Sequence, residues 1–357
     1  GNPYYNTPYN PSNPTGVAAA GNRFAYTLAP SLTVAANNAS RLYGAADPVF
    51  TYGISGFING DNPLAAVSGA AALSTTATPS SSVSGGPYAI TPSLGTLASD
   101  FNYGFTFVNG ALTIDPATLA ITANSFSKTY GQTVNFAGTE FTSLGLQNGE
   151  TIGSVALASL GAAPTANVAG SPYAITASNA SGGTFNAGNY LISYTNGALT
   201  VDPATLAITA NSFSKTYGQT VNFAGTEFSA PGLQNGETIG SVTLASLGAV
   251  NTANVSGSPY VITASNATGG TFNPGNYLIS YVNGALTVDP ATLTYIADPK
   301  TRLYGGANPA LTGSVTGFQN GETIATATTG ALTFSTLATP TTNVGNHAIT
   351  GSGLAAN

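Results

Sequence analysis

Few side chains in this sequence could take part in chemistry: one histidine, twelve carboxylates and six basic residues among 357 residues. An imidazole can act as a base or a metal ligand, but one histidine without cysteines makes neither a zinc site nor a catalytic set. His347 also stands where similar stretches have Tyr173 and Tyr260, so we interpret it as a ring in a tyrosine position. No serine-nucleophile, phosphate-loop or dinucleotide-binding motif occurs. The sequence therefore predicts no enzyme, and no catalytic, cofactor-binding or metal-binding residues.

The carboxylates recur in two settings, Asn-Gly-acid and Asp-Pro. Oxygens of the Asn-Gly-acid loops could bind Ca²⁺ weakly, but calcium takes about six to eight oxygen ligands and no clustered D-x-D-x-D run is present. We therefore expect plain polar turns, and an aspartate before proline is typical of an extended or turn conformation. The acids of the first setting are Asp61, Glu150, Glu237 and Glu322, and those of the second are Asp115, Asp202 and Asp289.

Two lysines raise the possibility of an isopeptide bond, which some surface proteins use in place of disulfides. Lys128 and Lys215 each stand two residues before a Tyr-Gly pair. The corresponding residues elsewhere in the chain are Arg41 and Arg302, and arginine cannot form that bond. We therefore do not expect isopeptide bonds.

The composition predicts an all-β protein. Only 5% of the residues are charged, where about 25% is usual, yet 42% are hydrophobic. Helix formers with charged side chains are scarce, whereas 44 glycines and 21 prolines indicate many short strands joined by tight turns.

Charge and cysteine content limit which classes of binding partner and which cellular compartment the sequence predicts. A net charge of −6 with six scattered basic residues excludes a basic patch for nucleic acid. No apolar run is long enough for a membrane helix, and no signal peptide is visible. There is no cysteine, which together with low charge and repeats suits a secreted bacterial surface protein. We expect a mature protein or an internal fragment.

The chain is a tandem array with a period of 87 residues. Tyr-Gly pairs begin at Tyr43, Tyr130, Tyr217 and Tyr304, each 87 residues after the one before. The second and third repeats differ at only 11 of 87 positions. The predicted domains are an N-terminal segment 1–31, a first repeat 32–119, a second 120–206, a third 207–293 and an incomplete fourth 294–357.

Within a repeat, alternating apolar residues and turns predict about six to eight short strands. In Tyr190–Val201 we expect two strands joined by a tight hairpin at Asn196-Gly197. The unit size favours a small immunoglobulin-like β-sandwich over a β-grasp-like unit, and a solenoid would need a shorter repeat. Short Asp-Pro links between units predict an elongated, stiff rod. The rings of the tyrosines that precede glycine, Tyr130, Tyr217 and Tyr304, should be at least half buried.

The two ends of the chain look like parts of neighbouring repeats. The fourth repeat stops where the others begin Asn-Tyr, so it lacks the closing hairpin. Residues 21–30 resemble a worn copy of that piece, and residues 1–20 are either a flexible lead-in or a tyrosine-rich contact segment. Either a longer array continues beyond residue 357, or the N-terminal segment of a neighbouring molecule adds a strand to the fourth repeat.

Several spaced motifs together carry a family resemblance. Each repeat opens with Lys/Arg-x-Tyr-Gly and continues with Asn-Gly-acid. The first three then have Tyr-x-Ile-Thr and end with Asn-Tyr followed by Asn-Gly-x-Leu-Thr and Pro-Ala-Thr-Leu, whereas the fourth has His347 in place of that tyrosine and lacks the closing stretch. This pattern resembles the MBG (mostly β, glycine-rich) domains of YGX type, over residues 32 to about 350. The resemblance implies a filamentous-haemagglutinin-like bacterial exoprotein in which such domains form a stalk, and it implies no catalytic or ligand residues.

The sequence thus favours a structural function: the shaft of a secreted bacterial surface fibre or adhesin, of the kind found in biofilms, which self-associates or continues into neighbouring repeats. The alternative is an adhesive module whose exposed aromatic loops bind glycans or a host surface. No cofactor is expected under either hypothesis.

Overall fold

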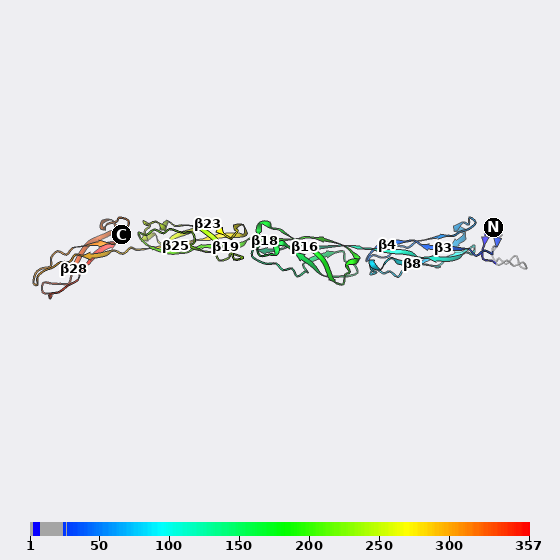
Figure 1. The fold of residues 1–357 in the computed structure, drawn as a ribbon, viewed down its shortest axis with the longest axis horizontal. Coiled ribbons are helices and arrows are strands. Elements are labelled where there is room, and N and C mark those ends of the chain that lie inside the picture. The colour runs from blue at the N-terminus through cyan, green and yellow to red at the C-terminus, as the bar shows by residue number, and fades with distance from the viewer. Residues whose placement is uncertain (1–2, 8–23, 26) are drawn as a thin grey trace. The chain divides into compact units, whose positions relative to one another are not determined.

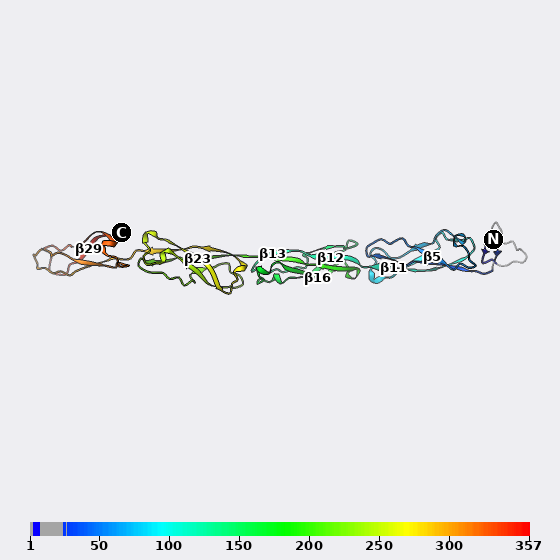
Figure 2. The ribbon, with the colours of Figure 1, turned by 90° about the horizontal axis from the view of Figure 1, so that it is seen from above.

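The computed structural model of the chain describes residues 3–7, 24–25 and 27–357, and these are built almost entirely from short strands (Figure 1, Figure 2). They divide into two compact units. The first comprises residues 1–127, 134–162 and 172–200, and the second comprises residues 128–133, 163–171 and 201–357. The division passes through the second repeat.

The third repeat, all of which is described, folds as two facing sheets. One sheet has the strand order β21-β19-β24 and the other has the order β20-β25-β23-β22. The pairs β19–β24 and β20–β25 are parallel, and the remaining pairs are antiparallel. The strands are β19 (Ala204–Ala210), β20 (Phe213–Thr216), β21 (Phe228–Ser229), β22 (Ile239–Ala245), β23 (Tyr260–Gly270), β24 (Tyr277–Val282) and β25 (Gly284–Asp289).

The first two repeats have the same strand order. The first also contains a short helix and a small two-stranded sheet: α1 (Pro63–Ala66), β6 (Val67–Ser68) and β9 (Ala98–Ser99). Its main strands are β3 (Ser31–Ala36), β4 (Ala39–Leu42), β5 (Tyr52–Ser55), β7 (Ala72–Ser74), β8 (Tyr88–Ser93), β10 (Gly104–Val108) and β11 (Gly110–Asp115). Those of the second are β12 (Ala117–Ala123), β13 (Phe126–Thr129), β14 (Phe141–Leu144), β15 (Ile152–Ala158), β16 (Tyr173–Gly183), β17 (Tyr190–Thr195) and β18 (Gly197–Asp202).

Alternation along the strands produces the core between the sheets. Leu119 and Ile121 of β12 belong to the same buried cluster as Ile175 of β16 and Leu199 of β18. Burying such side chains fully stabilises the fold by about 1.5–3 kcal/mol each. The prediction of an all-β chain of tandem, immunoglobulin-like sandwich repeats is confirmed.

The predicted hairpin at Asn196-Gly197 is wrong, because β17 and β18 belong to different sheets. β17 pairs in parallel with β12, whereas β18 pairs antiparallel with β16. A side chain at Gly197 would lie 2.5 Å from the Asn124 carbonyl oxygen, so glycine lets the chain cross closely from one sheet to the other. The piece predicted to be missing from the fourth repeat is therefore a pair of strands, one for each sheet.

In the fourth repeat, residues 294–357 contain no counterparts of β24 and β25. The elements present are β26 (Thr294–Ala297), β27 (Gly313–Thr316), α2 (Ile324–Ala327), β28 (Thr328–Thr336) and β29 (Ile349–Ala356). β26 pairs only with β27 in its sheet, whereas β19 has partners on both edges.

The repeats meet at proline, where strands of successive repeats join. β12 begins directly after Pro116 and β19 directly after Pro203. The predicted boundaries after residues 119 and 206 therefore lie inside these strands.

The described part of the N-terminal segment packs against the first repeat. β1 (Pro3–Tyr4) pairs in parallel with β2 (Phe24–Ala25), in the same sense as β20 with β25. Tyr5 is fully buried, so residues 3–7 form a contact segment and not a flexible lead-in. Residues 21–23 and 26 of the predicted remnant strand lie outside the described residues.

Candidate functional site

Each Tyr-Gly pair forms a turn at one end of its repeat, which we call the tyrosine corner. Gly131 has φ +91°, which favours glycine, and its N–H donates to the Pro164 carbonyl at 3.1 Å. The other corners repeat this contact at 3.0–3.2 Å. Their donors and acceptors are Gly44 with Pro79, Gly218 with Asn251, and Gly305 with Pro340.

A buried cation donates hydrogen bonds to carbonyls of the same loop. The Lys128 amine donates to the carbonyls of Gln132 and Ala163, and burial lowers its pKa. Lys215 makes the equivalent bonds to Gln219 and Val250. Arg41 and Arg302 donate to the carbonyls of Thr78 and Thr339. All four repeats thus place a cation that donates hydrogen bonds to carbonyls at the corner. Lysine and arginine can both do this, which explains why either residue occurs at this position.

The Asn-Gly-acid turn forms the opposite end of each repeat, together with the tyrosine that opens β17 or β24. We call this turn and tyrosine the acceptor. Asn235 and Gly236 have φ of 55° and 71°, so both central residues of the turn are left-handed. The Tyr277 hydroxyl accepts a hydrogen bond from the Gln234 N–H at 2.8 Å and donates to Glu237 Oε2. The acid side chain is therefore held in one orientation.

The tyrosine corner of the second repeat binds the acceptor of the third. The Tyr130 hydroxyl donates to Glu237 Oε1 at 2.6 Å, so this carboxylate joins two tyrosines from successive repeats. The Tyr130 and Tyr277 rings meet edge to face with centroids 5.5 Å apart. A second contact joins the Val168 N–H to Asn276 Oδ1 at 3.0 Å. All these residues lie in the second compact unit.

The junction of the first and second repeats, within the first compact unit, has the same geometry. The Tyr43 hydroxyl donates to Glu150 Oε1 at 2.7 Å, and the Tyr190 hydroxyl donates to Glu150 Oε2. The ring centroids of Tyr43 and Tyr190 are again 5.5 Å apart. Val83 donates to Asn189 Oδ1 at 3.0 Å. Tyr43 belongs to the buried core cluster of the second repeat, so the hydrophobic core continues across the junction.

The junction of the third and fourth repeats keeps half of this contact. The Tyr217 hydroxyl donates to Glu322 Oε1 at 2.7 Å, but no second tyrosine opens a strand beside Glu322. A cavity of about 420 Å³ lies there instead, with Tyr217, Val255, Leu293 and Glu322 in its wall.

Folding raises the pKa of the junction tyrosines above the usual value for a phenol. Burial and the hydrogen bond to Glu150 raise the pKa of Tyr190 to about 12. Burial and a hydrogen bond to Glu150 also raise the pKa of Tyr43, and burial and a hydrogen bond to Glu237 raise the pKa of Tyr130 and Tyr277. For Tyr217 the hydrogen bond to Glu322 is the main cause of the raised pKa. At neutral pH these phenols are therefore neutral hydrogen-bond donors.

The glycine of the corner leaves room for the next repeat. A side chain at Gly131 would lie 2.3 Å from Gln234 Oε1, and one at Gly44 would lie 2.5 Å from Gln147 Oε1. Any other residue would clash with the acceptor as well as strain the turn. Glycine therefore suits this position on both counts.

The burial predicted for the corner tyrosines holds for two of three. Tyr130 is 4% exposed and Tyr217 is partly buried, but Tyr304 is 66% exposed. The prediction for Tyr304 is wrong because these rings are covered by the following repeat, and not only by their own. Sequence reasoning missed this role of the tyrosine and the acid, although both recur at a fixed spacing of 107 residues in Tyr43–Glu150 and Tyr130–Glu237.

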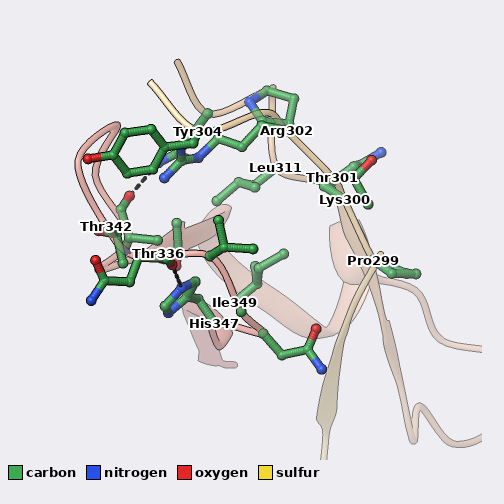
Figure 3. A pocket seen from close by; sticks show the side chains of 17 residues that line it. Pro299, Lys300, Thr301, Arg302, Tyr304, Leu311, Thr336, Thr342, His347 and Ile349 are labelled. Carbon is green, nitrogen blue, oxygen red and sulfur yellow. Dashed lines mark hydrogen bonds between the residues drawn. The ribbon is translucent and has the colours of Figure 1, made fainter. Parts of the chain in front are cut away.

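His347 lies at the tyrosine corner of the fourth repeat (Figure 3). Its Nε2 atom is 2.9 Å from the Asn343 carbonyl, much as the Tyr260 hydroxyl donates to the Asn254 carbonyl. A cavity of about 420 Å³ opens beside it, with Arg302, Tyr304 and Leu311 in its wall. In the third repeat the corresponding space between β20 and β23 is filled by β25.

In the described part of the chain, no group of three or more His, Asp or Glu residues is arranged to hold a metal ion. None of the described helices is long and apolar enough to cross a membrane. The four Asn-Gly-acid residues are spread over separate repeats, so the site that the structure builds from them is a set of contacts between repeats.

The fold and these contacts define a tandem array of small β-sandwich repeats joined end to end through tyrosine and carboxylate side chains. The family model of the MBG domain (YGX type) matches residues 32–113, 119–200, 206–287 and 293–357. The chain therefore belongs to this family. The matches fit a repeat-based structural or adhesive module.

Comparison with curated proteins gives no match. Among solved structures, the extracellular domain of protocadherin GammaB4 is similar over 64% of this chain and 44% of that chain, with 9% identity and a TM-score of 0.22. A tandem from titin is similar over 74% of this chain and 98% of that chain, with 12% identity and a TM-score of 0.18. The N-terminal four Ig domains of Dscam1 are similar over 74% of each chain, with 10% identity and a TM-score of 0.16. These low scores carry no argument about function.

Proposed function

We propose that this chain is part of the shaft of a secreted bacterial surface fibre or adhesin. The carrying observation is that two junctions, in separate compact units, repeat the same tyrosine–carboxylate–tyrosine contact. A contact that recurs with the same residues gives each repeat the same orientation to the next. Such an array supports a stiff spacer, and it needs no enzymatic activity.

The contacts suit a mechanical role because they are buried and charge-assisted. Hydrogen bonds to charged groups contribute about 1.5–3 kcal/mol each, more than neutral ones. The junction also has a continuous core through Tyr43 and a short covalent link through Asp115-Pro116. Each repeat then unfolds as its own block, while its neighbour stabilises it through the junction.

Small-angle scattering of the chain tests this function with a matched pair of variants. Glu237→Ala removes the shared acceptor between the second and third repeats. Glu227→Ala removes a glutamate that binds only backbone N–H groups of its own loop, at 2.9–3.0 Å. We expect Glu237→Ala to shorten the maximum dimension and broaden the distance distribution, and Glu227→Ala to leave both unchanged.

An unchanged distance distribution for a folded Glu237→Ala chain would contradict the stiff shaft.

The surface location is a separate part of the proposal. Protease treatment of intact cells that carry the protein should cleave the repeats, and protection from protease would count against an exposed fibre.

A glycan- or host-binding module is the second candidate, and one observation favours it. Phe107, Tyr194 and Tyr281 are 37–38% exposed and spaced by 87 residues, on β10, β17 and β24. Repeated aromatic faces can stack on sugars. These rings lie on strands and not on the loops that the sequence suggested. Reproducible binding on a glycan array that is lost in Tyr194→Ala and Tyr281→Ala would favour this function over a pure shaft.

A further inference from the structure

The strand β24 of the third repeat lies open at the edge of its sheet. Among the described residues its only neighbour in the sheet is β19, in the order β21-β19-β24. The register between the two strands is unbroken over all six residues of β24, from Tyr277 to Val282. An edge strand presents a row of backbone N–H and C=O groups that can pair with another chain. β17 has the same place in the second repeat, in the order β14-β12-β17.

The other three edges of the same sandwich carry features that hinder such pairing. β21 is only two residues long. β20 has four residues and contains Lys215, whose charged side chain is buried. β22 has a bulge, where its register with β23 shifts between Ser241 and Thr243. Short strands, inward charges and bulges are the means by which natural sheets avoid edge-to-edge pairing, and β24 has none of them.

The composition of β24 also favours pairing between chains. Its sequence, Tyr-Leu-Ile-Ser-Tyr-Val, contains no charge, glycine or proline, and β17 differs from it only at the last residue. Uncharged six-residue segments of high β-propensity are typical of strands that pair between chains. No charged residue or histidine occurs between Glu237 and Asp289. Two copies of this strand can therefore approach each other without like charges facing across the pair.

The order of side chains along β24 makes the strand complementary to a second copy of itself. In an antiparallel pair centred on Ser280, Leu278 lies opposite Val282 on one face of the sheet. Leu278 is 68% exposed and Val282 is 46% exposed, so both gain burial in this pair. On the other face Ile279 lies opposite Tyr281, and a β-branched residue opposite an aromatic ring is a favourable cross-strand pair.

We propose that the open edges of β24 and β17 are lateral docking sites for a second copy of the chain, which pairs there antiparallel and edge to edge. Such a pair is isologous, because each copy contributes the same strand, and it joins two three-stranded sheets into one. β10 of the first repeat has Gly104 in the place of Leu278 and is therefore less suited to this pairing. The contact lies between chains, so it is independent of the junctions within one chain that Glu237→Ala tests.

Sedimentation equilibrium of the 357-residue chain, from low to high micromolar concentration, tests the proposal with charges placed at the centre of both edges. The unaltered chain should associate reversibly. Ser193→Lys with Ser280→Lys places like charges opposite each other, so it should lower the association constant by about tenfold or more. Both serines are exposed. Ser193→Glu with Ser280→Glu should have the same effect. An equimolar mixture of the lysine and glutamate chains should restore association, because opposite charges then face each other.

The matched control is Leu160→Lys with Leu247→Lys. These leucines are 88% and 86% exposed, and they lie outside the strands, in the short helices η2 (Leu160–Ala162) and η5 (Leu247–Ala249). The control adds the same two positive charges away from the edges. It should leave the association constant unchanged.

Four results would overturn the proposal. The first is an unaltered chain that stays monomeric over the whole concentration range. The second is undiminished association of the lysine chain, since it would use another surface. The third is an equal loss in the control, which would indicate a general effect of charge. The fourth is a mixture of lysine and glutamate chains that associates no better than either chain alone.

Hydrogen exchange checks that the second and third repeats are folded in each variant. If the serine variants unfold a repeat, Leu191→Lys with Leu278→Lys takes their place, because a lysine on an edge strand also blocks pairing. The first three results then decide.

Discussion

The third and fourth repeats begin with similar strands but bury them differently. In β19, Leu206 and Ile208 are fully buried. In the fourth repeat, the corresponding Leu293 and Tyr295 are only partly buried. The difference is the pair β24 and β25, which places Leu286 and Val288 in the core of the third repeat. The first strand of a repeat therefore depends on the last two strands for its burial.

The largest expected effect is on the free energy of unfolding when this core is truncated. Leu206→Ala should destabilise the third repeat by about 3–5 kcal/mol, because the fully buried side chain leaves a cavity. Leu293→Ala should cost about 1 kcal/mol, because water already reaches that position. Hydrogen exchange resolved by repeat measures both, and equal losses would show that β24 and β25 do not create the difference.

The corner tyrosines of the second and fourth repeats also differ in burial. Tyr130→Ala should cost about 3 kcal/mol, because a buried ring and a bond to Glu237 are both lost. Tyr304→Ala should change stability by about 0.5 kcal/mol or less, as is usual for exposed positions. Thermal unfolding followed by repeat-resolved exchange distinguishes them. A large effect of Tyr304→Ala would mean that its ring packs within its own repeat.

Alkaline pH should lower the stability that the junction tyrosines contribute. A tyrosine whose pKa is raised by folding stabilises fully below its unfolded pKa of about 10, and this contribution is lost as pH rises through the folded pKa. For Tyr190 the loss should therefore fall between about pH 10 and about pH 12. Absorbance titration of the phenols and unfolding curves over this range should coincide for the unaltered chain. In Tyr190→Phe, the part of the loss that depends on this group should disappear.

A small effect on stability is also expected at the link between repeats. Pro203→Gly should lower the stability of each repeat by about 1 kcal/mol or less, because it mainly increases the freedom of the unfolded chain. It should nevertheless broaden the distance distribution in small-angle scattering. An unchanged distribution would indicate that the tyrosine–carboxylate contact alone holds the junction.

The sequence predicts where the strands lie better than it predicts which strands pair with each other. Alternation around Asn196-Gly197 identifies β17 and β18, but alternation is the same whether two strands pair with each other or lie in different sheets. The parallel pairs β12–β17 and β19–β24 depend on residues about 70 positions apart, which local patterns do not encode. The 87-residue period predicts the repeats without this information.

The contact between successive repeats could not be predicted from the sequence for a different reason. Tyr130 and Glu237 each have an ordinary interpretation inside one repeat, as a core ring and a polar turn. Their contact appears only when two repeats are placed end to end. A signal was present in Lys128 and Arg41, since a cation retained two residues before Tyr-Gly in every repeat indicates a common structural task.

Because the first two junctions are built from the same residues, the number of repeats can change without altering the contact between them. Recombination between the nearly identical second and third repeats, which differ at 11 of 87 positions, would add or remove a block that begins and ends in the same register. The new block would bring its own tyrosine corner and its own acceptor. Populations that carry this gene are therefore expected to vary in the length of the array in steps of 87 residues.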